Sequence, residues 1–332
     1  MKPNASTSLG ENETAEPLQV LLYYNYTPIA DAEAFSVTHK EFCDSLGLRG
    51  RILIGEEGIN GTVSGSESAC QAYMAWFAED ERFKDTEFKI DPTDEHLFPK
   101  LSVRYRQEIV ALGLGDEDLH PRDLTGRHLT PVEWREALKA GVPGEDYVLI
   151  DVRNDYESDL GHFRGALKPP LENFRDFPDW VRENLADKKD KKILTYCTGG
   201  IRCEKFSGFL RQEGFEDVSQ LHGGIIKYGK DEETKGELFD GLCYVFDKRI
   251  SVEVNRTEDK RVVSCCAVTG ESSVRYVNCA LFSCNGRMIL SEEGEAQFGR
   301  FCSDECKARA AAGERASADV PGVGIEPQFD DR

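Results

Sequence analysis

The segment TYCTGGIRCEKFSGFL holds the residues best placed for chemistry. Cys197 follows the apolar run KILTY, and Arg202 stands at the expected start of a helix. The loop between them consists of Thr198, Gly199, Gly200 and Ile201. Paired glycines let backbone N–H groups point at an anion, and a helix N-terminus and an arginine both add positive charge. We predict that Cys197 is a nucleophilic thiolate with a pKa below its usual value of about 8.5; the alternative is a buried cysteine that ends a core strand.

The elements that must position this loop alternate short strands and helices over residues 143–237. YVLID, KILTY and VSQLH are the expected strands, with helices between them. Short apolar strands between helices are typical of a parallel sheet with both faces covered. Residues 116–142 are expected to be a linker with one helix, since Thr130, Pro131 and Glu133 fit its N-cap, first turn and N3 position.

Three stretches of this part resemble a rhodanese domain: IDVRNDYESDLGHFRGA, the cysteine loop and LHGGI. In that family the loop cysteine carries a persulfide, and Cys197 matches it. Asp151 and Arg153 match the Asp-x-Arg after the first strand and are expected to support the site. Cys197 and Arg202 have the C-x4-R spacing of sulfurtransferase-type rhodaneses, whereas the related phosphatases use C-x5-R. Cys203, in the first turn of the next helix, is either a resolving thiol or a packing residue.

Residues 19–115 are expected to form a ferredoxin-like α+β domain, because their strand and helix patterns follow the order βαββαβ with one more strand. Such a sheet is the scaffold of RNA-recognition modules, in which aromatic side chains on the open face stack on bases. The candidate RNA-binding residues are Tyr24, Tyr26, Lys100, Arg104 and Arg106. Core packing is the alternative role for the tyrosines, and simple solvation is the alternative for the basic residues.

The chain as a whole resembles the rhodanese-like tRNA uridine 5-hydroxylase family. The match is carried by GRILIGEEGINGTVSG, FPKLSVRYRQEIVALG, LTGRHLTPVEW, CTGGIRCEK and GLCYVFDKRISV. The resemblance implies an oxidoreductase of tRNA processing that makes 5-hydroxyuridine at the wobble position of the anticodon loop, with molecular oxygen as co-substrate. A thiolate that adds to C6 of uracil leaves an enolate at C5, and this is our hypothesis for Cys197. The Gly199–Gly200 amides and Arg202 would stabilise the developing charge.

Other functions fit the same loop. In a second route to the hydroxylated base, Cys197 is present as a persulfide or sulfenate, and oxygen is transferred from that group to the base. A plain rhodanese-type sulfurtransferase would use Cys197 and Arg202 to move sulfur from thiosulfate or a persulfide to a thiol, cyanide or tRNA, but it leaves two further domains unexplained. A non-enzymatic RNA-binding or redox-sensing module is the third interpretation, and Cys197→Ser separates it from both enzymes.

Cysteines punctuate residues 265–307, which have few aliphatic residues and cannot bury much core without a metal. The family resemblance leads us to expect four cysteine pairs here, interleaved to form two metal sites. The first pair survives only as Cys266, and Ser291 and Gly294 stand in place of the third. We predict one structural Zn²⁺ on the two intact pairs; the alternative is a metal-free region with free thiols. The intact pairs are Cys279, Cys284, Cys302 and Cys306.

Composition limits the remaining choices. The 332 residues carry 41 Lys and Arg against 61 Asp and Glu, a formal charge of −20, which excludes a globally basic surface that would coat nucleic acid. The six histidines lack ligand spacing, so we predict no flavin, haem or NAD. The eleven cysteines indicate a reducing compartment, and no stretch has the length of a membrane helix, so we expect a cytoplasmic protein that does not contact a membrane.

The expected fold is therefore α/β. It comprises an N-terminal ferredoxin-like α+β domain, a central rhodanese-type parallel α/β domain and a small Cys-rich C-terminal region. Residues 238–264 are expected to link the last two parts and to contain strand-like pieces at LCYVF and RISVEV. Residues 1–18 and 308–332 are expected to be disordered tails. The oligomeric state does not follow from the sequence.

Overall fold

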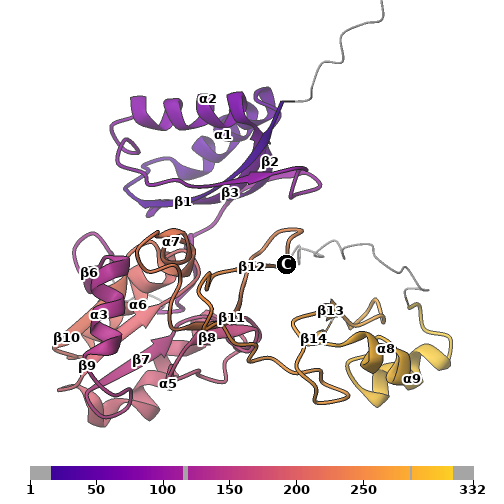
Figure 1. Cartoon of the computed structure of the whole chain (residues 1–332). Coiled ribbons are helices and arrows are strands. Elements are labelled where there is room, and N and C mark those ends of the chain that lie inside the picture. The colour runs from indigo at the N-terminus through magenta and orange to yellow at the C-terminus, as the bar shows by residue number, and fades with distance from the viewer. Residues whose placement is uncertain (1–15, 115–118, 285, 317–332) are drawn as a thin grey trace, which may run out of the picture.

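The computed structural model describes residues 16–114, 119–284 and 286–316. An N-terminal domain lies above a central domain in Figure 1, and a smaller C-terminal region lies to one side of the central domain. The ferredoxin-like, parallel α/β and Cys-rich parts expected from the sequence are all present, so the predicted fold class is confirmed.

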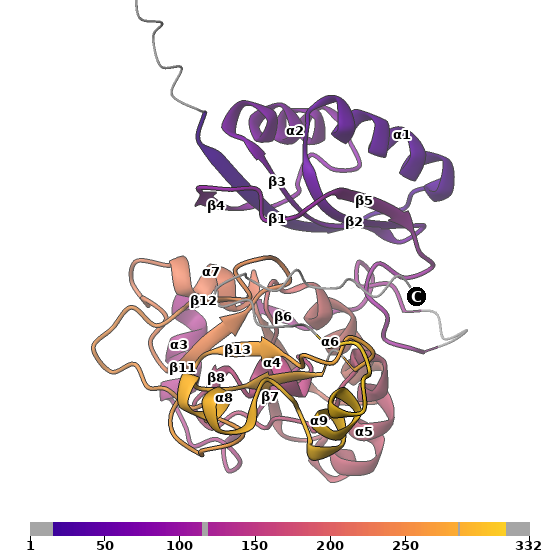
Figure 2. The ribbon, with the colours of Figure 1, turned by 90° about the vertical axis from the view of Figure 1, so that its right-hand side faces the viewer.

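The N-terminal domain is a five-stranded sheet covered on one face by two helices (Figure 2). Its elements are β1 Leu18–Tyr26, α1 Ala32–Ser45, β2 Arg49–Gly55, β3 Gly58–Ser66, α2 Glu67–Glu79, β4 Lys89–Thr93 and β5 Leu101–Tyr105. The strand order β4-β1-β3-β2-β5 is that of a ferredoxin-like sheet with β5 added parallel to β2. Asp31 and Ser66 begin the two helices, since each side chain accepts a backbone N–H of the first turn.

Side chains of β1 alternate between the two faces of this sheet. Tyr23 packs in the core under α1 and α2, whereas Leu22 packs on the apolar core of the central domain. Tyr24 and Tyr26 follow Leu22 at every second position and share its face, as the sequence predicts. Lys89 lies directly opposite Leu22 in the antiparallel β1–β4 pair, and paired residues share a face. All four side chains are therefore directed at the central domain.

The central domain is built on a parallel sheet of four strands in the order β6-β10-β9-β7. Its elements are β6 Arg127–Leu129, α3 Pro131–Lys139, β7 Tyr147–Asp151, α4 Asp155–Ser158, β8 Gly161–Phe163, α5 Phe177–Asn184, β9 Lys192–Tyr196, α6 Ile201–Gln212, β10 Asp217–Leu221 and α7 Gly224–Lys230. Apolar residues of α5 and α6 cover one face and those of α3 and α7 cover the other, as the apolar strands predict. The predicted capping box of Thr130 and Glu133 begins α3.

Two segments expected to be linkers are part of the folded structure. β6 lies within residues 116–142 and forms the edge of the parallel sheet beside β10. A strand of three residues at a sheet edge carries too little apolar pattern to be detected in a sequence. Residues 238–264 contain β11 Phe239–Tyr244 and β12 Ser251–Glu253, which join β8 in a third sheet.

The C-terminal region has a small apolar cluster of its own, which includes buried cysteines. Its elements are β13 Tyr276–Asn278, β14 Arg287–Ile289, α8 Glu292–Phe298 and α9 Asp304–Ala311. The expected tail from residue 308 is wrong at its start, because α9 continues past that position; the helix begins at the N-cap Ser303, which accepts the Cys306 N–H. Residues 1–15 and 317–332 of the expected tails lie outside the described residues. None of the helices in the described ranges combines the length and apolarity of a membrane span.

Candidate active site

Cys197 directly follows β9, at the carboxyl end of an inner strand of the parallel sheet, where α/β folds bind their ligands. Gly200 precedes α6 with a φ of 105°, in the left-handed region that glycine adopts without strain. A Cβ atom on Gly200 would lie 2.8 Å from the hydroxyl oxygen of Tyr24. The turn aims the Gly200 N–H at the sulfur of Cys197, with an N–Sγ distance of 3.1 Å. Both the backbone conformation and the close approach of Tyr24 require glycine here.

The surroundings of Cys197 favour the thiolate. Complete burial raises its pKa, but hydrogen bonds from Cys203 and Gly200 and the positive charge of Arg202 outweigh burial and lower the pKa to about 6. At pH 7 the thiolate therefore exceeds the thiol roughly tenfold. Burial, together with the adjacent Cys197, raises the pKa of Cys203 well above its usual value. Cys203 is thus a neutral donor to the thiolate in this structure, and its role as a resolving thiol stays a prediction.

Arg202 is held by a buried carboxylate. Its guanidinium makes two hydrogen bonds to Glu157, with Nη1–Oε2 and Nη2–Oε1 distances of 2.6 and 2.8 Å. The Glu157 side chain has no exposed surface and also accepts the Thr198 hydroxyl at 3.3 Å. Arg202 therefore keeps its charge beside Cys197 while two of its donors are committed to Glu157. Sequence reasoning missed Glu157, which lies 45 positions before Arg202 and carries no local motif.

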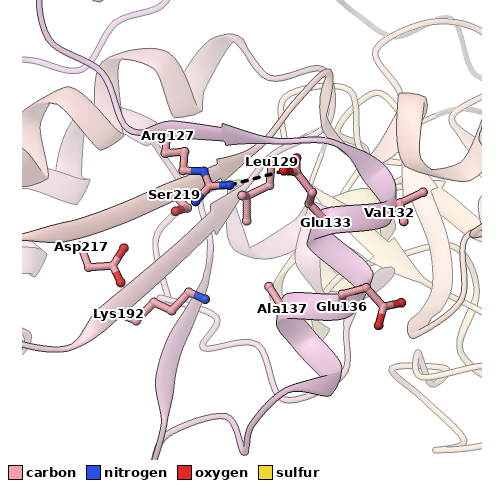
Figure 3. A pocket seen from close by; sticks show the side chains of 9 residues that line it. All are labelled: Arg127, Leu129, Val132, Glu133, Glu136, Ala137, Lys192, Asp217 and Ser219. Carbon is pink, nitrogen blue, oxygen red and sulfur yellow. Dashed lines mark hydrogen bonds and ion pairs between the residues drawn. The ribbon is translucent and has the colours of Figure 1, made fainter.

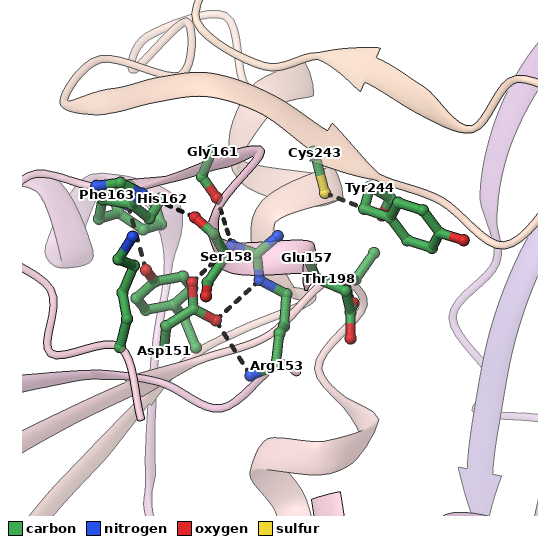
Figure 4. A network of polar contacts seen from close by, with 12 residues as sticks. Asp151, Arg153, Glu157, Ser158, Gly161, His162, Phe163, Thr198, Cys243 and Tyr244 are labelled. Atoms are coloured by element: carbon green, nitrogen blue, oxygen red, sulfur yellow. Dashed lines mark hydrogen bonds and ion pairs between the residues drawn. The ribbon is translucent and has the colours of Figure 1, made fainter. Parts of the chain in front are cut away.

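Asp151 and Arg153 form a second buried ion pair (Figure 4). Nη2 of Arg153 lies 2.6 Å from Oδ2 of Asp151 and donates to the carbonyl oxygen of Gly161 at 2.6 Å. The pair ties the end of β7 to the start of β8 and has no exposed surface. This position fits the supporting role predicted for both residues, because neither side chain is open to a substrate.

The N-terminal sheet lies over the central domain (Figure 2), and Leu22 and Tyr24 of its strand β1 lie closely against Gly199 and Gly200 of the Cys197 loop. The Tyr24 hydroxyl donates to Glu204 of α6 at 2.9 Å, and the Tyr26 hydroxyl donates to the carbonyl oxygen of Ile201 at 3.3 Å. Cys197 consequently has no exposed surface. The expectation that this sheet face is open for stacking on bases is therefore wrong for the closed structure. A strand pattern shows that a face is apolar or aromatic, but it does not show which domain covers the face.

Ion pairs surround this contact between the domains. Acidic residues of the N-terminal domain meet lysines of the central domain and of the segment that follows it. The pairs are Glu57–Lys205, Glu87–Lys227, Asp91–Lys230 and Glu95–Lys248, with N–O distances of 2.8, 2.5, 2.6 and 3.1 Å. Charged groups thus form much of the contact that closes the site.

Two further residues beside the loop were not predicted from the sequence, Glu204 and Lys89. Glu204 is bound by four side chains: Tyr24, Thr125, His128 and Gln220. Burial raises the pKa of Glu204, but these donors outweigh burial and lower it, so Glu204 is a buried anion. Lys89 is 7% exposed, and its Nζ stands 5.3 Å from the centre of the Tyr24 ring. Only the packing of the two domains brings Lys89 to Cys197, so no local sequence signal reveals it. Glu204 lies seven residues after Cys197 on α6, but its burial and its four partners depend on tertiary contacts.

The basic residues predicted to bind RNA lie at the β5 edge of the N-terminal sheet. Arg104 is in register with Leu53 of β2, whose neighbours Ile52 and Ile54 face the helices, so Arg104 shares the face directed at the central domain. Lys100 and Arg106 are exposed. Arg106 directly follows the end of β5, and its N–H donates to the Ile54 carbonyl oxygen of β2 at 2.8 Å.

A hollow at the opposite end of the parallel sheet is a poorer candidate site (Figure 3). Arg127, Lys192 and Asp217 line it, and they are the first residues of β6, β9 and β10. Arg127 is paired with Glu133 at 3.3 Å. Ligands of parallel sheets bind at the carboxyl ends of the strands, whereas these are the amino ends. The Cys197 loop is therefore the better candidate site.

Four C-terminal cysteines converge in a second, separate cluster. The sulfur atoms of Cys279, Cys284, Cys302 and Cys306 lie within 4.8 Å of one another. The Sγ–Sγ distances are 3.4 Å for Cys284–Cys302 and 3.5 Å for Cys302–Cys306. A Zn²⁺ with four thiolates at about 2.3 Å spaces its sulfurs roughly 3.8 Å apart, so these residues fit a tetrahedral zinc ion.

Residues at the positions of the two incomplete cysteine pairs also lie together in this region. The Thr269 N–H donates to the sulfur of Cys266 at 3.4 Å, and Ser291 is hydrogen-bonded to the same sulfur. A Cβ atom on Gly294 would lie 2.5 Å from it. The two sets of positions are thus interleaved along the chain, and this second set offers a single thiol.

Comparison with known proteins places this geometry in a family. Family models match residues 18–109 (UPF0176 acylphosphatase like domain), 135–231 (Rhodanese-like domain) and 240–307 (Rhodanase C-terminal). A tRNA uridine(34) hydroxylase of Streptococcus uberis is 53% identical over 298 residues, which cover 89% of each chain. Its counterpart in Bacillus cereus is 55% identical over 294 residues, which cover 89% of this chain and 90% of the relative. The chain belongs to the tRNA uridine(34) hydroxylase family.

Among solved structures, the rhodanese-like domain of an Anabaena sp. protein is 26% identical, covers 35% of this chain and 80% of that chain, and has a TM-score of 0.29. In this member of the tRNA uridine(34) hydroxylase family, the rhodanese-like match contains Cys197 and Arg202. The acylphosphatase-like match contains Tyr24 and Lys89. The candidate site therefore lies where the two matched segments meet.

Proposed function

We propose that this protein hydroxylates C5 of the wobble uridine in the anticodon loop of tRNA, with molecular oxygen as co-substrate. The observation that carries the proposal is the buried Cys197 thiolate in a chain 53–55% identical to tRNA uridine(34) hydroxylases. A plain sulfurtransferase has to present its loop cysteine to small donors and acceptors, whereas Cys197 lies under a second domain. A domain that closes over the loop suits a reaction on one base that must be kept from water.

Cys197 is the proposed nucleophile. C5 of uracil does not react with oxygen by itself, but addition of the thiolate to C6 makes C5 part of an electron-rich enolate that can be oxidised. Gly200, Arg202 and Cys203 supply the thiolate by lowering the pKa of Cys197. We assign Arg202 to the thiolate, whose pKa its charge lowers, and two of its N–H donors hold it on Glu157. Stabilisation of charge on the base by Arg202 stays a prediction.

The N-terminal domain is proposed to bind the tRNA. Tyr24 and Tyr26 lie directly over the Cys197 loop, so we assign them to the target base and its neighbours. Lys100 and Arg106 are exposed at the sheet edge and are assigned to backbone phosphates, with Arg104 on the adjoining face. With a formal charge of −20, binding is confined to such local groups.

A structural Zn²⁺ on Cys279, Cys284, Cys302 and Cys306 is proposed to hold the C-terminal region together. The region has only a small apolar cluster, and four thiolates without a metal would repel one another. The ion would cross-link the turn that carries one cysteine pair to the start of α9, which carries the other.

Mass spectrometry of tRNA nucleosides tests the function. A strain that lacks the gene is complemented with wild type, Cys197→Ser or Cys243→Ser. Cys243 is the matched control, because it is a fully buried thiol whose pKa is raised to about 12 by burial. We expect 5-hydroxyuridine and its derivatives to return with wild type and Cys243→Ser and to stay absent with Cys197→Ser. Loss of thiolated uridines instead would favour sulfur transfer to tRNA, and no change in either would refute the tRNA assignment.

A further inference from the structure

Several hydrogen-bond donors around Cys197 already have acceptors. They pair as Gly200 with Cys197, Arg202 with Glu157, Tyr24 with Glu204, and Tyr26 with the Ile201 carbonyl oxygen. Three lysines of the domain contact are paired as well, since Lys205, Lys227 and Lys230 each have a carboxylate within 2.8 Å. A cationic donor outside these pairs is therefore the group best placed to bind a base that enters this site.

Lys89 is that residue. It is 7% exposed and lies on the sheet face directed at the Cys197 loop. Within the described ranges, its ammonium makes no hydrogen bond and has no carboxylate within 4 Å; it stands over the ring of Tyr24. A largely buried lysine whose ammonium has no carboxylate beside it is free to bind an acceptor that arrives with the substrate.

Building on the function proposed above, we propose that Lys89 forms an oxyanion-binding site for O4 of the target uridine, on the side of the base opposite the Cys197 thiolate. Lys89 belongs to the N-terminal domain and Cys197 to the central domain, so a base held between the domains meets both. An ammonium donates hydrogen bonds but accepts none. The site consequently favours uracil, which has a carbonyl at C4, over cytosine, which has an amino group there.

The step assigned to Lys89 needs no oxidant. The Cys197 sulfur forms a bond to C6, the C5=C6 π bond breaks, and its electron pair moves through C4 to leave the negative charge on O4. Lys89 donates a hydrogen bond to O4 as that charge develops. C5 of the adduct then takes up a proton from water, and reversal of the addition removes a proton from C5 and releases the thiolate. Repeated addition and reversal therefore exchanges the hydrogen on C5 with solvent.

The pH profile of this exchange follows from the groups around Lys89. Burial lowers the pKa of Lys89 to about 8, and the neighbouring charges act in both directions. The groups that face its ammonium are Tyr24 of β1, Glu87 before β4, Cys197, Glu204 of α6 and Lys227 of α7, with His222 paired to Glu87. Cys197 must be ionised, which occurs above about pH 6, and Lys89 must be protonated, which holds below about pH 8. Exchange is therefore expected to be highest between these values.

The test measures loss of deuterium from a tRNA transcript that carries 5-deuterated uridine at the wobble position, incubated with the full-length protein without oxygen. Lys89→Met removes the charge at similar length, and Lys89→Arg keeps it. Lys84→Met is the matched control, because Lys84 is an exposed lysine of the same domain that pairs with Glu81. Removal of one oxyanion donor typically costs about 10²–10³ in rate, so we expect Lys89→Met to slow exchange roughly 100-fold, with Lys89→Arg between it and wild type.

Two further readouts separate this role from damage to the fold. Alkylation of Cys197 by iodoacetamide at pH 8.5 is expected to be no slower in Lys89→Met, since the donors to the thiolate remain. The variant is expected to unfold at the same or a higher denaturant concentration, because the charge removed from this largely buried side chain has no ion-pair partner.

Equal exchange in wild type and Lys89→Met would overturn the role of Lys89 and leave the proposed function intact. A wild-type enzyme that hydroxylates uridine without exchanging C5 would also overturn it, because no C6 adduct would then form. A wild-type protein that does neither, and whose gene deletion leaves 5-hydroxyuridine in tRNA, would overturn the function itself and the role of Lys89 with it.

Discussion

Lys205→Met is expected to expose Cys197. The Lys205 ammonium on α6 lies 2.8 Å from Glu57 and 2.7 Å from Glu108, and it donates to the Val110 carbonyl oxygen at 3.1 Å. Glu57 belongs to the N-terminal domain, whereas Lys205 belongs to the helix that follows the Cys197 loop. Without the Lys205 ammonium, Glu57 and Glu108 lie close together with no cation between them when the two domains are in contact. An open arrangement, in which water solvates both, is then favoured.

The size of this effect follows from the exposure of the three side chains. Loss of one partner from a fully buried ion pair costs about 3–5 kcal/mol. The side chains of Lys205 and Glu57 are 5% and 11% exposed, but that of Glu108 is 35% exposed, so water offsets part of the loss. We expect about 2 kcal/mol, which shifts the opening equilibrium roughly 30-fold. Cys197 has no exposed surface when the domains are closed, so its alkylation rate follows that equilibrium.

The assay is the rate of iodoacetamide labelling of Cys197 under native conditions, read by peptide mass spectrometry. Lys139→Met is the control, since the Lys139–Glu237 pair at 2.9 Å lies away from the domain contact. Salt at about 1 M, which shortens the Debye length to about 3 Å, should accelerate labelling of wild type in the same direction. Labelling of a folded Lys205→Met protein at the wild-type rate would refute the reasoning, because the ion pair would then not hold the domains over the thiolate.

Two other predictions concern the thiolate and the metal. Labelling of wild-type Cys197 should rise with pH through a midpoint at about pH 6 and level off above it. Arg202→Met should move this midpoint upward by roughly one to three pH units, because a cation is lost and Glu157 is left unpaired. An unchanged midpoint in stopped-flow labelling would contradict the role of Arg202. Elemental analysis after chelator-free purification should find about one zinc per chain in wild type and in the control Cys265→Ser, and much less in Cys302→Ser. A zinc content below about 0.2 per chain in wild type would refute the proposed metal site.

Predictions from the sequence were most reliable where the relevant residues are contiguous. The Cys197 loop is one example, since the need for glycine at position 200 and the start of α6 are properties of the local backbone. The capping box of Thr130 and Glu133 is another. The alternation along β1 also placed Tyr24 and Tyr26 on one face. In each case the physical cause acts over a few residues, so a single segment contains all of the information.

Predictions failed where a short or exposed segment gains its structure from a neighbour. β6 has three residues and exists because β10 offers its edge. Hydrogen bonds to β10, rather than local propensity, determine this strand, which is why it was assigned to a linker. The strand-like pieces expected within residues 238–264 are present as β11 and β12, but only the pairing of β11 with β12 and with β8 makes the segment part of a folded sheet.

The sequence by itself indicated Cys197 and its loop as the candidate site, the three-part fold and the four cysteines that could share a metal. Only the tertiary structure decided what surrounds the thiolate. Glu157, Glu204 and Lys89 reach Cys197 from other elements, and the sheet that carries Lys89 closes over the loop. Interactions of buried charges depend on distance and burial in space, and neither can be read from spacing along a chain.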